Sequence, residues 1–327
     1  MQNLPRNYLS CLDEAREMVR SHNIDAIRAI FGNVPDTLSQ LIRTAFIPSE
    51  GHKFVVADFS AIEARVIAWL AGEDWVNEVF RTHGKIYEAT ASQMFGVPVE
   101  RIAKGNPEYS LRQKGKVATL ALGYQGGTSA LIAMGALKMG IPEEDLPDIV
   151  TRWRQANPHI VALWRLVEDA AVAAVQTARP QDVRGLLTFR LEGESTFGQM
   201  FLTVELPSKR KLYYPEPSLE ENRFGKLAVH FSAAGTAKKW GRESTYGGKL
   251  TENIVQATAR DCLAVTLERI DAAGLQTVFH VHDEVIVDAP METTVEAVCG
   301  LMAQPIPWAP GLVLKGAGFE GQYYQKD

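Results

Sequence analysis

Two carboxylates lie at the centre of a segment that is typical of a β-hairpin. Residues 277–289 contain two apolar runs, and these flank His282, Asp283 and Glu284. Apolar runs separated by a short polar turn predict a hairpin, which would place Asp283 and Glu284 at its tip. Aspartate is also a favoured turn residue, because it hydrogen-bonds its own backbone. The hairpin alone is therefore more typical of a solvated turn than of a catalytic site.

A further carboxylate comes at the end of a predicted strand. Residues 53–58, KFVVAD, are apolar until Asp58, and a helix is predicted from about residue 60 to residue 70. A strand-end carboxylate beside a hairpin-tip carboxylate could hold two divalent metal ions. Magnesium takes one or two carboxylates plus substrate phosphates, and paired ions about 4 Å apart stabilise both oxygens of a phosphoryl transfer. Asp58 and Asp283 are the candidate metal ligands.

A third segment predicts a helix with a cationic end and an aromatic end. Arg112, Lys116, Leu120 and Tyr124 recur every four residues, so on a helix they share one face. The cationic end suits a triphosphate and the aromatic end suits a base. Taken alone, this pattern is more typical of an ordinary amphipathic helix with solvated charges.

In this order, the three segments resemble the motifs of family A DNA polymerases, the DNA polymerase I class. The motifs are DFSAIEAR at 58–65, RQKGKVATLALGY at 112–124 and HVHDEV at 280–285. The resemblance extends from QNLPR at residue 2 through AFIP at residue 45 to VLKGAGFEGQYY at 313–324, and residues 240–261 are most similar to bacteriophage members. It implies a template-directed DNA polymerase core that adds dNTPs to a primer 3'-hydroxyl, with two Mg²⁺ ions or Mn²⁺ as cofactor.

The resemblance implies an α+β fold, with a palm formed by an antiparallel sheet and flanking helices and with a helical fingers subdomain. Residues 1–73 would be the first part of the palm, 74–180 the helical fingers, and 181–327 the second part with the catalytic hairpin. From residue 185 the pattern predicts strands at 186–191, 200–206, 211–214 and 226–231, a helix at about 251–273, another at about 292–303, and a last strand near 312–315. Nothing in the sequence assigns a role to residues 185–250.

The catalytic roles that the resemblance implies fall on a small set of residues. Asp58 and Asp283 would bind the metal ions together with the backbone carbonyl of Phe59. Glu284 would be an accessory carboxylate. Lys116 would donate a proton to the leaving pyrophosphate.

The resemblance also implies which residues would contact the incoming nucleotide. Arg112 and Lys116 would bind the triphosphate, and Tyr87 stands where a triphosphate-binding histidine is common. Tyr124 would lie where the templating base enters, and Leu120 replaces an aromatic residue that usually packs near the sugar. Glu63 matches a steric gate that leaves no room for a 2'-hydroxyl, although a first-turn glutamate is also favoured by the helix dipole alone.

Four residues match or lie near positions that contact primer-template DNA: Arg65, Gln256, Arg260 and His282. Gln256 is the best match, because a glutamine can read the acceptors common to all base pairs in the minor groove. Arg260 is equally compatible with a solvated helix. His282 is more typical of a turn residue with a local hydrogen bond.

Bulk composition agrees with an ordinary globular protein. The 327 residues are 46% hydrophobic and 22% charged, and no segment predicts a signal peptide or a membrane span. We expect a cytosolic protein, in a bacterial host cytosol if it comes from a phage. A net charge of -5 argues mildly against a general nucleic-acid binder. Its basic residues gather locally, at residues 101–116 and 209–211.

Three hypotheses follow. The first is the polymerase core, acting on primer-template DNA and dNTPs. Because the resemblance covers neither a thumb nor an exonuclease domain, this chain would be a fragment or one half of a split polymerase, with a separate chain supplying them. The second is a non-catalytic DNA-binding or assembly subunit of such a polymerase. The third, a metal-dependent nuclease, gives no reason for the Arg112 to Tyr124 pattern.

Overall fold

The computed structural model describes residues 4–194, 198–222, 224–235 and 239–325. The chain separates into two compact units. Unit 1 comprises Met1–Ser60, Cys262–Gln304 and Leu314–Asp327, and unit 2 comprises Ala61–Asp261 and Pro305–Val313. The units divide after Ser60, directly after the first predicted strand, and after Asp261, inside a long helix. These positions differ from the predicted boundaries at 73/74 and 180/181.

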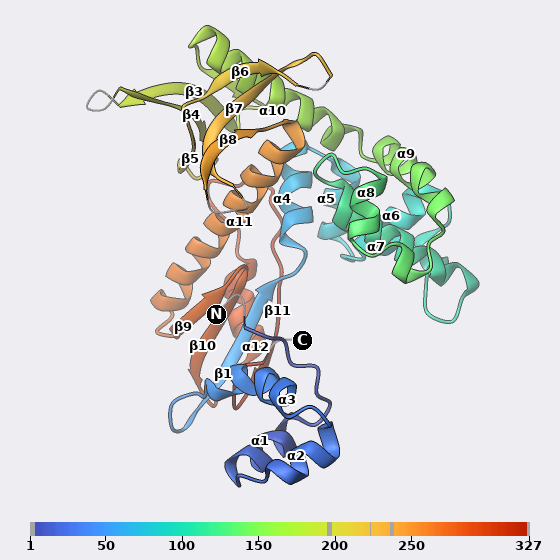
Figure 1. Ribbon diagram of the computed structural model, residues 1–327, viewed down its shortest axis with the longest axis vertical. Helices are drawn as coiled ribbons and strands as arrows, with labels where there is room; N and C mark the ends of the chain where they lie inside the picture. The colour runs from blue at the N-terminus through green and yellow to red at the C-terminus, as the bar shows by residue number, and fades with distance from the viewer. Residues whose placement is uncertain (1–3, 195–197, 223, 236–238, 326–327) are drawn as a thin grey trace. The chain divides into compact units, whose positions relative to one another are not determined.

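Unit 1 is built on a four-stranded antiparallel sheet (Figure 1). Its strands, in spatial order, are β11 (Gly316–Gly321), β1 (His52–Phe59), β10 (Glu284–Pro290) and β9 (Gln276–Val281). Phe54, Val56 and Ile286 form one buried cluster with Tyr324. Because side chains alternate along a strand, Val55 points to the opposite face. Helix α12 (Val295–Ala303) packs on β1 and β11.

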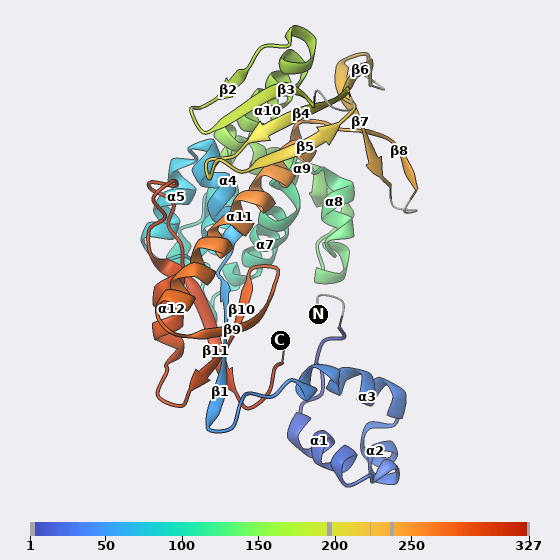
Figure 2. The same ribbon diagram turned by 90° about the vertical axis from the view of Figure 1, so that its left-hand side faces the viewer.

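Three short helices precede this sheet in unit 1 and pack on one another (Figure 2). They are α1 (Leu12–Arg20), α2 (Ile24–Phe31) and α3 (Val34–Leu41), followed by the 3-10 turn η1 (Ile42–Ala45). The side chains of Asn23 and Asn33 accept hydrogen bonds from the first turns of α2 and α3. Such caps satisfy amides that the helix itself leaves unpaired.

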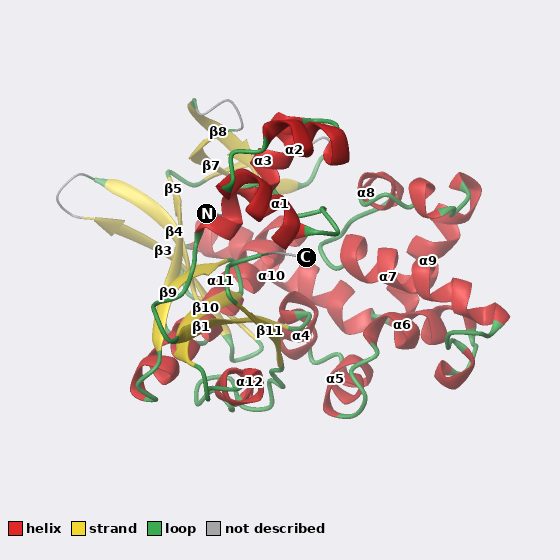
Figure 3. Cartoon of the chain, turned by 90° about the horizontal axis from the view of Figure 1, so that it is seen from below, coloured by secondary structure: helices red, strands yellow, loops and turns green. Residues whose placement is uncertain are grey.

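Unit 2 begins with a run of helices (Figure 3). They are α4 (Ile62–Ala71), α5 (Asp74–Arg81), α6 (Ile86–Phe95), α7 (Leu111–Leu122), α8 (Thr128–Ala133), α9 (Leu146–Ala156) and α10 (Pro158–Thr177). The 3-10 turns η2 (Val99–Arg101), η3 (Pro107–Ser110), η4 (Leu137–Met139) and η5 (Glu143–Asp145) connect them. Between α9 and α10 the rings of Trp153 and Trp164 stack, with centroids 6.2 Å apart.

A buried carboxylate joins the start of α10 to the turn after α4. Glu73 is only 3% exposed and accepts hydrogen bonds from the amides of His159 and Ile160. Burial raises the pKa of Glu73, while these two amides lower it. The carboxylate therefore satisfies the first turn of α10 in place of a side-chain cap on Asn157.

Two antiparallel sheets follow, and α10 packs against both (Figure 2). The first consists of β2 (Gln181–Val183), β3 (Leu187–Glu194), β4 (Gln199–Glu205) and β5 (Lys211–Pro215). The second consists of β6 (Ser218–Glu221), β7 (Leu227–Ala234) and β8 (Trp240–Ser244), and helix α11 (Gly247–Ala272) follows it. The four strands predicted here correspond to β3, β4, β5 and β7, whereas β2, β6 and β8 were missed.

In the described part of the chain, no helix combines the length and the apolar character needed to cross a bilayer.

The predicted last strand near residues 312–315 is wrong. These residues have no strand pairing, and the strand is β11, with the sequence GAGFEG. Glycine has a low strand propensity, so sequence pattern disfavours this segment. At Gly318 the reason for glycine is tertiary, because a Cβ there would collide with the Val56 carbonyl oxygen in β1.

We predict that Gly318→Ala destabilises the protein by about 1 to 3 kcal/mol, the usual cost of overpacking. The matched control is Gly300→Ala in α12, where a Cβ would meet nothing within 4 Å. That control should be neutral or stabilising by about 0.5 to 1 kcal/mol, since alanine favours helix. Urea unfolding of both variants measures the difference, and equal stability for the two would contradict the close approach of β11 to β1.

Candidate active site

The first set of predicted site residues comes together at one end of the unit 1 sheet. Asp58, near the end of β1, pairs in register with Glu284, the first residue of β10. The Phe59 amide donates a hydrogen bond of 3.3 Å to the Asp283 carbonyl. The predicted hairpin is confirmed, with His282 and Asp283 as a two-residue turn between β9 and β10. Asp58 and Asp283 therefore lie on adjacent strand ends.

The chemistry of these residues fits a hard divalent cation. Asp58 is exposed and Asp283 is partly exposed, so both carboxylates are open to solvent. Together with the Phe59 carbonyl they offer oxygen ligands only. Among the described residues no three His, Cys, Asp or Glu side chains gather into a metal-binding group. Magnesium takes one or two carboxylates and keeps positions for water and phosphate.

Glu284 lies in a different environment from the one expected at a hairpin tip. It is 5% exposed, inside the sheet, and accepts a hydrogen bond of 2.7 Å from the Tyr324 hydroxyl. Tyr324 in turn accepts a hydrogen bond of 3.0 Å from the buried Arg43. Burial and the neighbouring Glu284 raise the pKa of Tyr324. The position of Glu284 at the exposed tip is therefore corrected, because its carboxylate is enclosed and held by the C-terminal segment.

The second set of predicted residues lies in unit 2, on and around α7. Arg112, Lys116 and Leu120 share one face of this helix, and Leu120 is 45% exposed. The helix ends at Leu122, so Tyr124 lies in the turn that follows rather than on the helix as expected. The four-residue spacing predicted that the helix continues to Tyr124. A single glycine, Gly123, within an apolar run is weak evidence for a helix end.

Arg112 has an acidic partner that sequence spacing did not indicate. Its Nε lies 2.8 Å from a carboxylate oxygen of Glu88 on α6, and its guanidinium lies 5.3 Å from the centre of the Tyr87 ring. Gly115 permits this arrangement, because a Cβ there would collide with the Tyr87 carbonyl oxygen. The close approach of α6 and α7 thus places Tyr87 and Glu88 beside Arg112.

A hydrogen-bonded group joins Glu63, Tyr124 and Gln256. The Tyr124 hydroxyl donates to one carboxylate oxygen of Glu63 at 3.0 Å, and the Gln256 amide nitrogen lies 3.5 Å from the other. Burial, followed by the charge of Glu63, raises the pKa of Tyr124 well above its usual value. Gln125, which has a positive φ of 64°, accepts from the Gly248 amide and so ties the start of α11 to the same turn.

Of the four predicted DNA contacts, two lie together. Gln256 and Arg260 are exposed and one turn apart on α11. His282 is exposed in the unit 1 hairpin. Arg65 is 3% exposed, donates to the Val313 carbonyl at 3.0 Å and lies 4.1 Å from the centre of the Phe80 ring.

Burial lowers the pKa of Arg65 to about 10. The guanidinium is buried against Val313 and Phe80 of unit 2, so its position does not support the predicted DNA contact.

Most basic residues in the two predicted basic regions have acidic partners that the sequence did not reveal. The pairs are Arg101 with Glu108, Arg112 with Glu88, Lys114 with Asp145, Lys209 with Glu205, Arg210 with Asp261, and Lys211 with Glu192. The local excess of positive charge predicted for residues 101–116 is therefore largely neutralised. Exposed pairs of this kind contribute little stability, so their main effect is on the surface potential.

Comparison with known proteins identifies the family. The family model described as DNA polymerase family A matches residues 21–177. A DNA polymerase of Bacillus phage SP02 is 56% identical over 329 residues, which cover 100% of this chain and 49% of that protein. The chain belongs to DNA polymerase family A. The thermostable DNA polymerase I of Thermus aquaticus is 29% identical over 82% of this family A chain and 26% of its own length.

A solved structure has the same mixed fold of helices and antiparallel sheets. It is described as the POL domain of Pol1 from M. smegmatis in complex with DNA primer-template and dNTP. It superimposes with a TM-score of 0.56 at 20% identity, covering 87% of this family A chain and 42% of that one. The chain spans about half the length of its phage relative and about a quarter of the Thermus enzyme.

We predict that Glu88→Gln strengthens the binding of inorganic triphosphate by about fivefold, roughly 1 kcal/mol, if Arg112 is a phosphate ligand. The amide oxygen can still accept from the Arg112 Nε, while the negative charge that opposes the phosphates is removed. Isothermal titration at two salt concentrations measures the effect, which should shrink at high salt. Arg112→Gln is the control and should weaken binding. Unchanged or weaker binding by Glu88→Gln would contradict this electrostatic role.

Proposed function

We propose that this chain carries the nucleotidyl-transfer centre of a template-directed DNA polymerase. The observation that carries the proposal is the pairing of β1 with β10, which brings Asp58 and Asp283 to adjacent strand ends. Membership of family A and the shared fold support it. In the proposed reaction a primer 3'-oxygen forms a bond to the α-phosphorus of a dNTP, and the bond to the β-phosphate oxygen breaks to release pyrophosphate.

Asp58, Asp283 and the Phe59 carbonyl are the groups that would hold two Mg²⁺ ions, or Mn²⁺. When bound, such ions neutralise the charge that develops on the attacking and leaving oxygens. In unit 2, Arg112 and Lys116 would bind the triphosphate, and Lys116 would give a proton to the departing pyrophosphate. Lys116 is partly buried, so part of its stem is covered by neighbouring side chains.

Glu63 is the proposed selector for deoxynucleotides. Its carboxylate accepts from Tyr124, and Gln256 lies at the limit of hydrogen-bonding distance from it, so two neighbours restrain its orientation. A restrained side chain excludes a 2'-hydroxyl better than a mobile one, because moving it aside costs its hydrogen bonds. Leu120 and Tyr124 would lie next to the sugar and the templating base.

The proposed partners are dNTPs and primer-template DNA, with Gln256, Arg260 and His282 as the DNA contacts. By likeness to the family, the unit 1 sheet would be the palm, and helices α5 to α10, within residues 74–180, would belong to the fingers. A separate chain that supplies thumb and exonuclease domains stays a prediction, as does the cytosolic location.

The alternative is a non-catalytic DNA-binding or assembly subunit. The presence of both Asp58 and Asp283 at neighbouring strand ends favours catalysis, because a binding role gives no reason to keep them. A nuclease would use the same carboxylates but would not require Arg112, Lys116 and the group around Glu63.

Asp58→Asn and Asp283→Asn should each abolish primer extension while leaving DNA affinity within about twofold, because a metal ligand acts by stabilising charge in the transition state. Rates of single-nucleotide addition and DNA titrations measure the two properties. Asp25→Asn, at a side chain that is 95% exposed on α2, is the control and should be as active as wild type. A loss smaller than about tenfold, or 1.4 kcal/mol of barrier, in either test variant would remove the metal-ligand assignment.

Glu63→Ala should raise ribonucleotide incorporation relative to deoxynucleotide incorporation by at least about tenfold, because truncation opens space beside the sugar. Glu63→Gln is the matched control, since it keeps the bulk of the side chain and can still accept from Tyr124. The ratio of kcat/KM for dCTP and CTP measures selectivity. If Glu63→Ala keeps the selectivity of wild type, the gate lies elsewhere.

A further inference from the structure

A chain of hydrogen bonds runs from both terminal segments of the described chain to the predicted catalytic hairpin of unit 1, and it is buried from Arg43 onward. Arg43, in η1, is 2% exposed and donates through Nε to the Pro5 carbonyl at 2.7 Å and through Nη2 to the Leu4 carbonyl at 2.6 Å. Its Nη1 donates to the Tyr324 hydroxyl at 3.0 Å. Tyr324 then contacts Glu284 at 2.7 Å.

The direction of these bonds is fixed by the chemistry of the groups. A guanidinium has five donors and no acceptor, so the Tyr324 oxygen must accept from Arg43. The phenolic proton must then point to the Glu284 carboxylate. A hydroxyl that accepts from a cation is a stronger donor, and hydrogen bonds to an ionised group are the strong kind. Arg43 therefore donates to Tyr324, and Tyr324 donates to Glu284.

The ring of Tyr324 is held without help from its hydroxyl. Its backbone amide donates to the Phe46 carbonyl at 2.9 Å, and its ring packs edge-on against Phe279 with centroids 5.2 Å apart. It is 0% exposed and belongs to the same buried cluster as Val56 and Ile286. Replacing the tyrosine with phenylalanine would therefore remove the hydroxyl and leave the ring in place.

Glu284 is the residue through which this arrangement can reach the candidate metal ligands. It follows Asp283 directly and lies opposite Asp58 in register, and it has little access to water. A buried carboxylate that loses a donor must change its rotamer or bring water in. Either change would alter the end of β10, on which Asp283 depends.

We propose that Tyr324, oriented by Arg43, is a positioning residue that fixes the Glu284 carboxylate and thereby the metal-binding end of β10. The proposal rests on the proposed function in treating Asp58 and Asp283 as metal ligands. It gives the C-terminal segment a part in catalysis, although Tyr324 itself touches no substrate.

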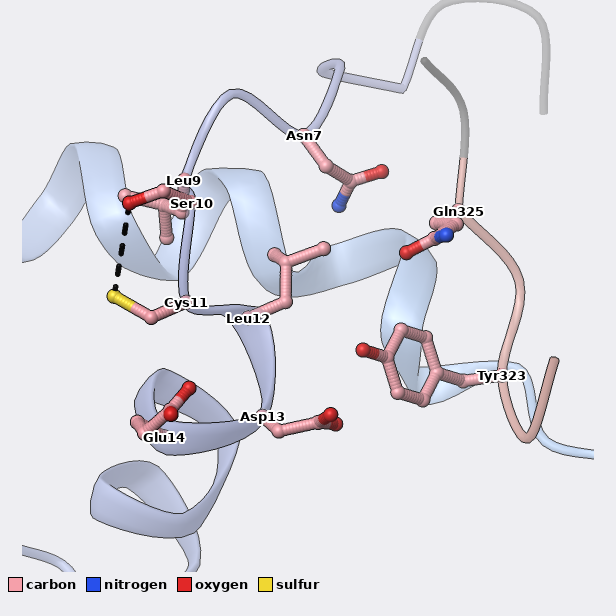
Figure 4. A pocket seen from close by; sticks show the side chains of 9 residues that line it. All are labelled: Asn7, Leu9, Ser10, Cys11, Leu12, Asp13, Glu14, Tyr323 and Gln325. Carbon is pink, nitrogen blue, oxygen red and sulfur yellow. Dashed lines mark hydrogen bonds between the residues drawn. The ribbon is translucent and has the colours of Figure 1, made fainter.

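The test compares Tyr324→Phe with Tyr323→Phe, which makes the same chemical change one residue away. Tyr323 is partly exposed, lies 3.9 Å from the Arg16 guanidinium, and lines a cavity of about 350 Å³ beside α1 (Figure 4). For each folded protein, kcat and KM for a dNTP are measured in primer extension. Mn²⁺ affinity is measured by electron paramagnetic resonance, with Asp58→Asn as the reference for loss of the site.

Tyr324→Phe should lower kcat by about ten- to a hundredfold, the cost of slightly misplaced catalytic groups, with KM for the dNTP unchanged within about twofold. It should weaken Mn²⁺ binding by at least about threefold, since second-sphere partners tune metal affinity. Tyr323→Phe should change neither property. Adding Tyr324→Phe to Glu284→Gln should have less than about a twofold further effect, because two residues that act through one contact are not additive.

The proposal is overturned if Tyr324→Phe keeps kcat and Mn²⁺ affinity within about twofold of wild type, or if its effect multiplies with that of Glu284→Gln. Should Tyr324→Phe not fold, Arg43→Lys takes its place under the same criteria, because it keeps the buried charge but loses the three-way donor geometry. Wild-type protein that binds Mn²⁺ without extending primers would contradict the polymerase assignment. In that case the Mn²⁺ titrations still decide whether Tyr324 positions the site.

Discussion

The antiparallel pairing of β1 with β10 is the constraint on which the candidate metal site depends. The register runs without interruption from His52 opposite Pro290 to Asp58 opposite Glu284. A shift by one residue would turn every side chain of a strand to the other face. Such a shift would take Phe54 and Val56 out of the buried cluster and move Asp58 out of line with Glu284. The apolar core and the position of the carboxylates are therefore secured by the same pairing.

Ion pairing limits the positive charge that unit 2 presents to a nucleotide or to DNA. Arg112 is engaged by Glu88, and Arg210 is engaged by Asp261. With a net charge of -5, the chain has little long-range attraction for phosphate. The binding of a nucleotide or of DNA would depend on short-range contacts, in which a phosphate replaces a carboxylate as the acceptor of the arginine hydrogen bonds. The exchange is favourable only where the phosphate makes more hydrogen bonds than the carboxylate it displaces.

The features that the sequence predicted correctly are local ones. Apolar runs predicted β1 and the hairpin of β9 and β10. The misses are consequences of tertiary contacts. β11 has a glycine at position 318 because β1 lies too close there for a side chain. Glu88 and Tyr324 are 24 and 40 residues from their partners, and no spacing rule connects such distant positions. Arg65 donates to the carbonyl of Val313, which is 248 residues away in the sequence, so the sequence pattern gave no sign of this contact.

The strands between α10 and α11 acquire a structural role from one contact. The family model match ends at residue 177 and β2 begins at Gln181, whereas the phage relative matches the whole chain. In the turn between β4 and β5, Arg210 donates to Asp261 at 2.5 Å and to the Ala257 carbonyl at 2.7 Å. Ser208 donates to the same aspartate. A guanidinium that bridges a side chain and a backbone carbonyl one turn apart fixes both the position and the rotation of a helix. These contacts thereby set the direction in which the exposed face of α11 points, with Gln256 and Arg260 on it.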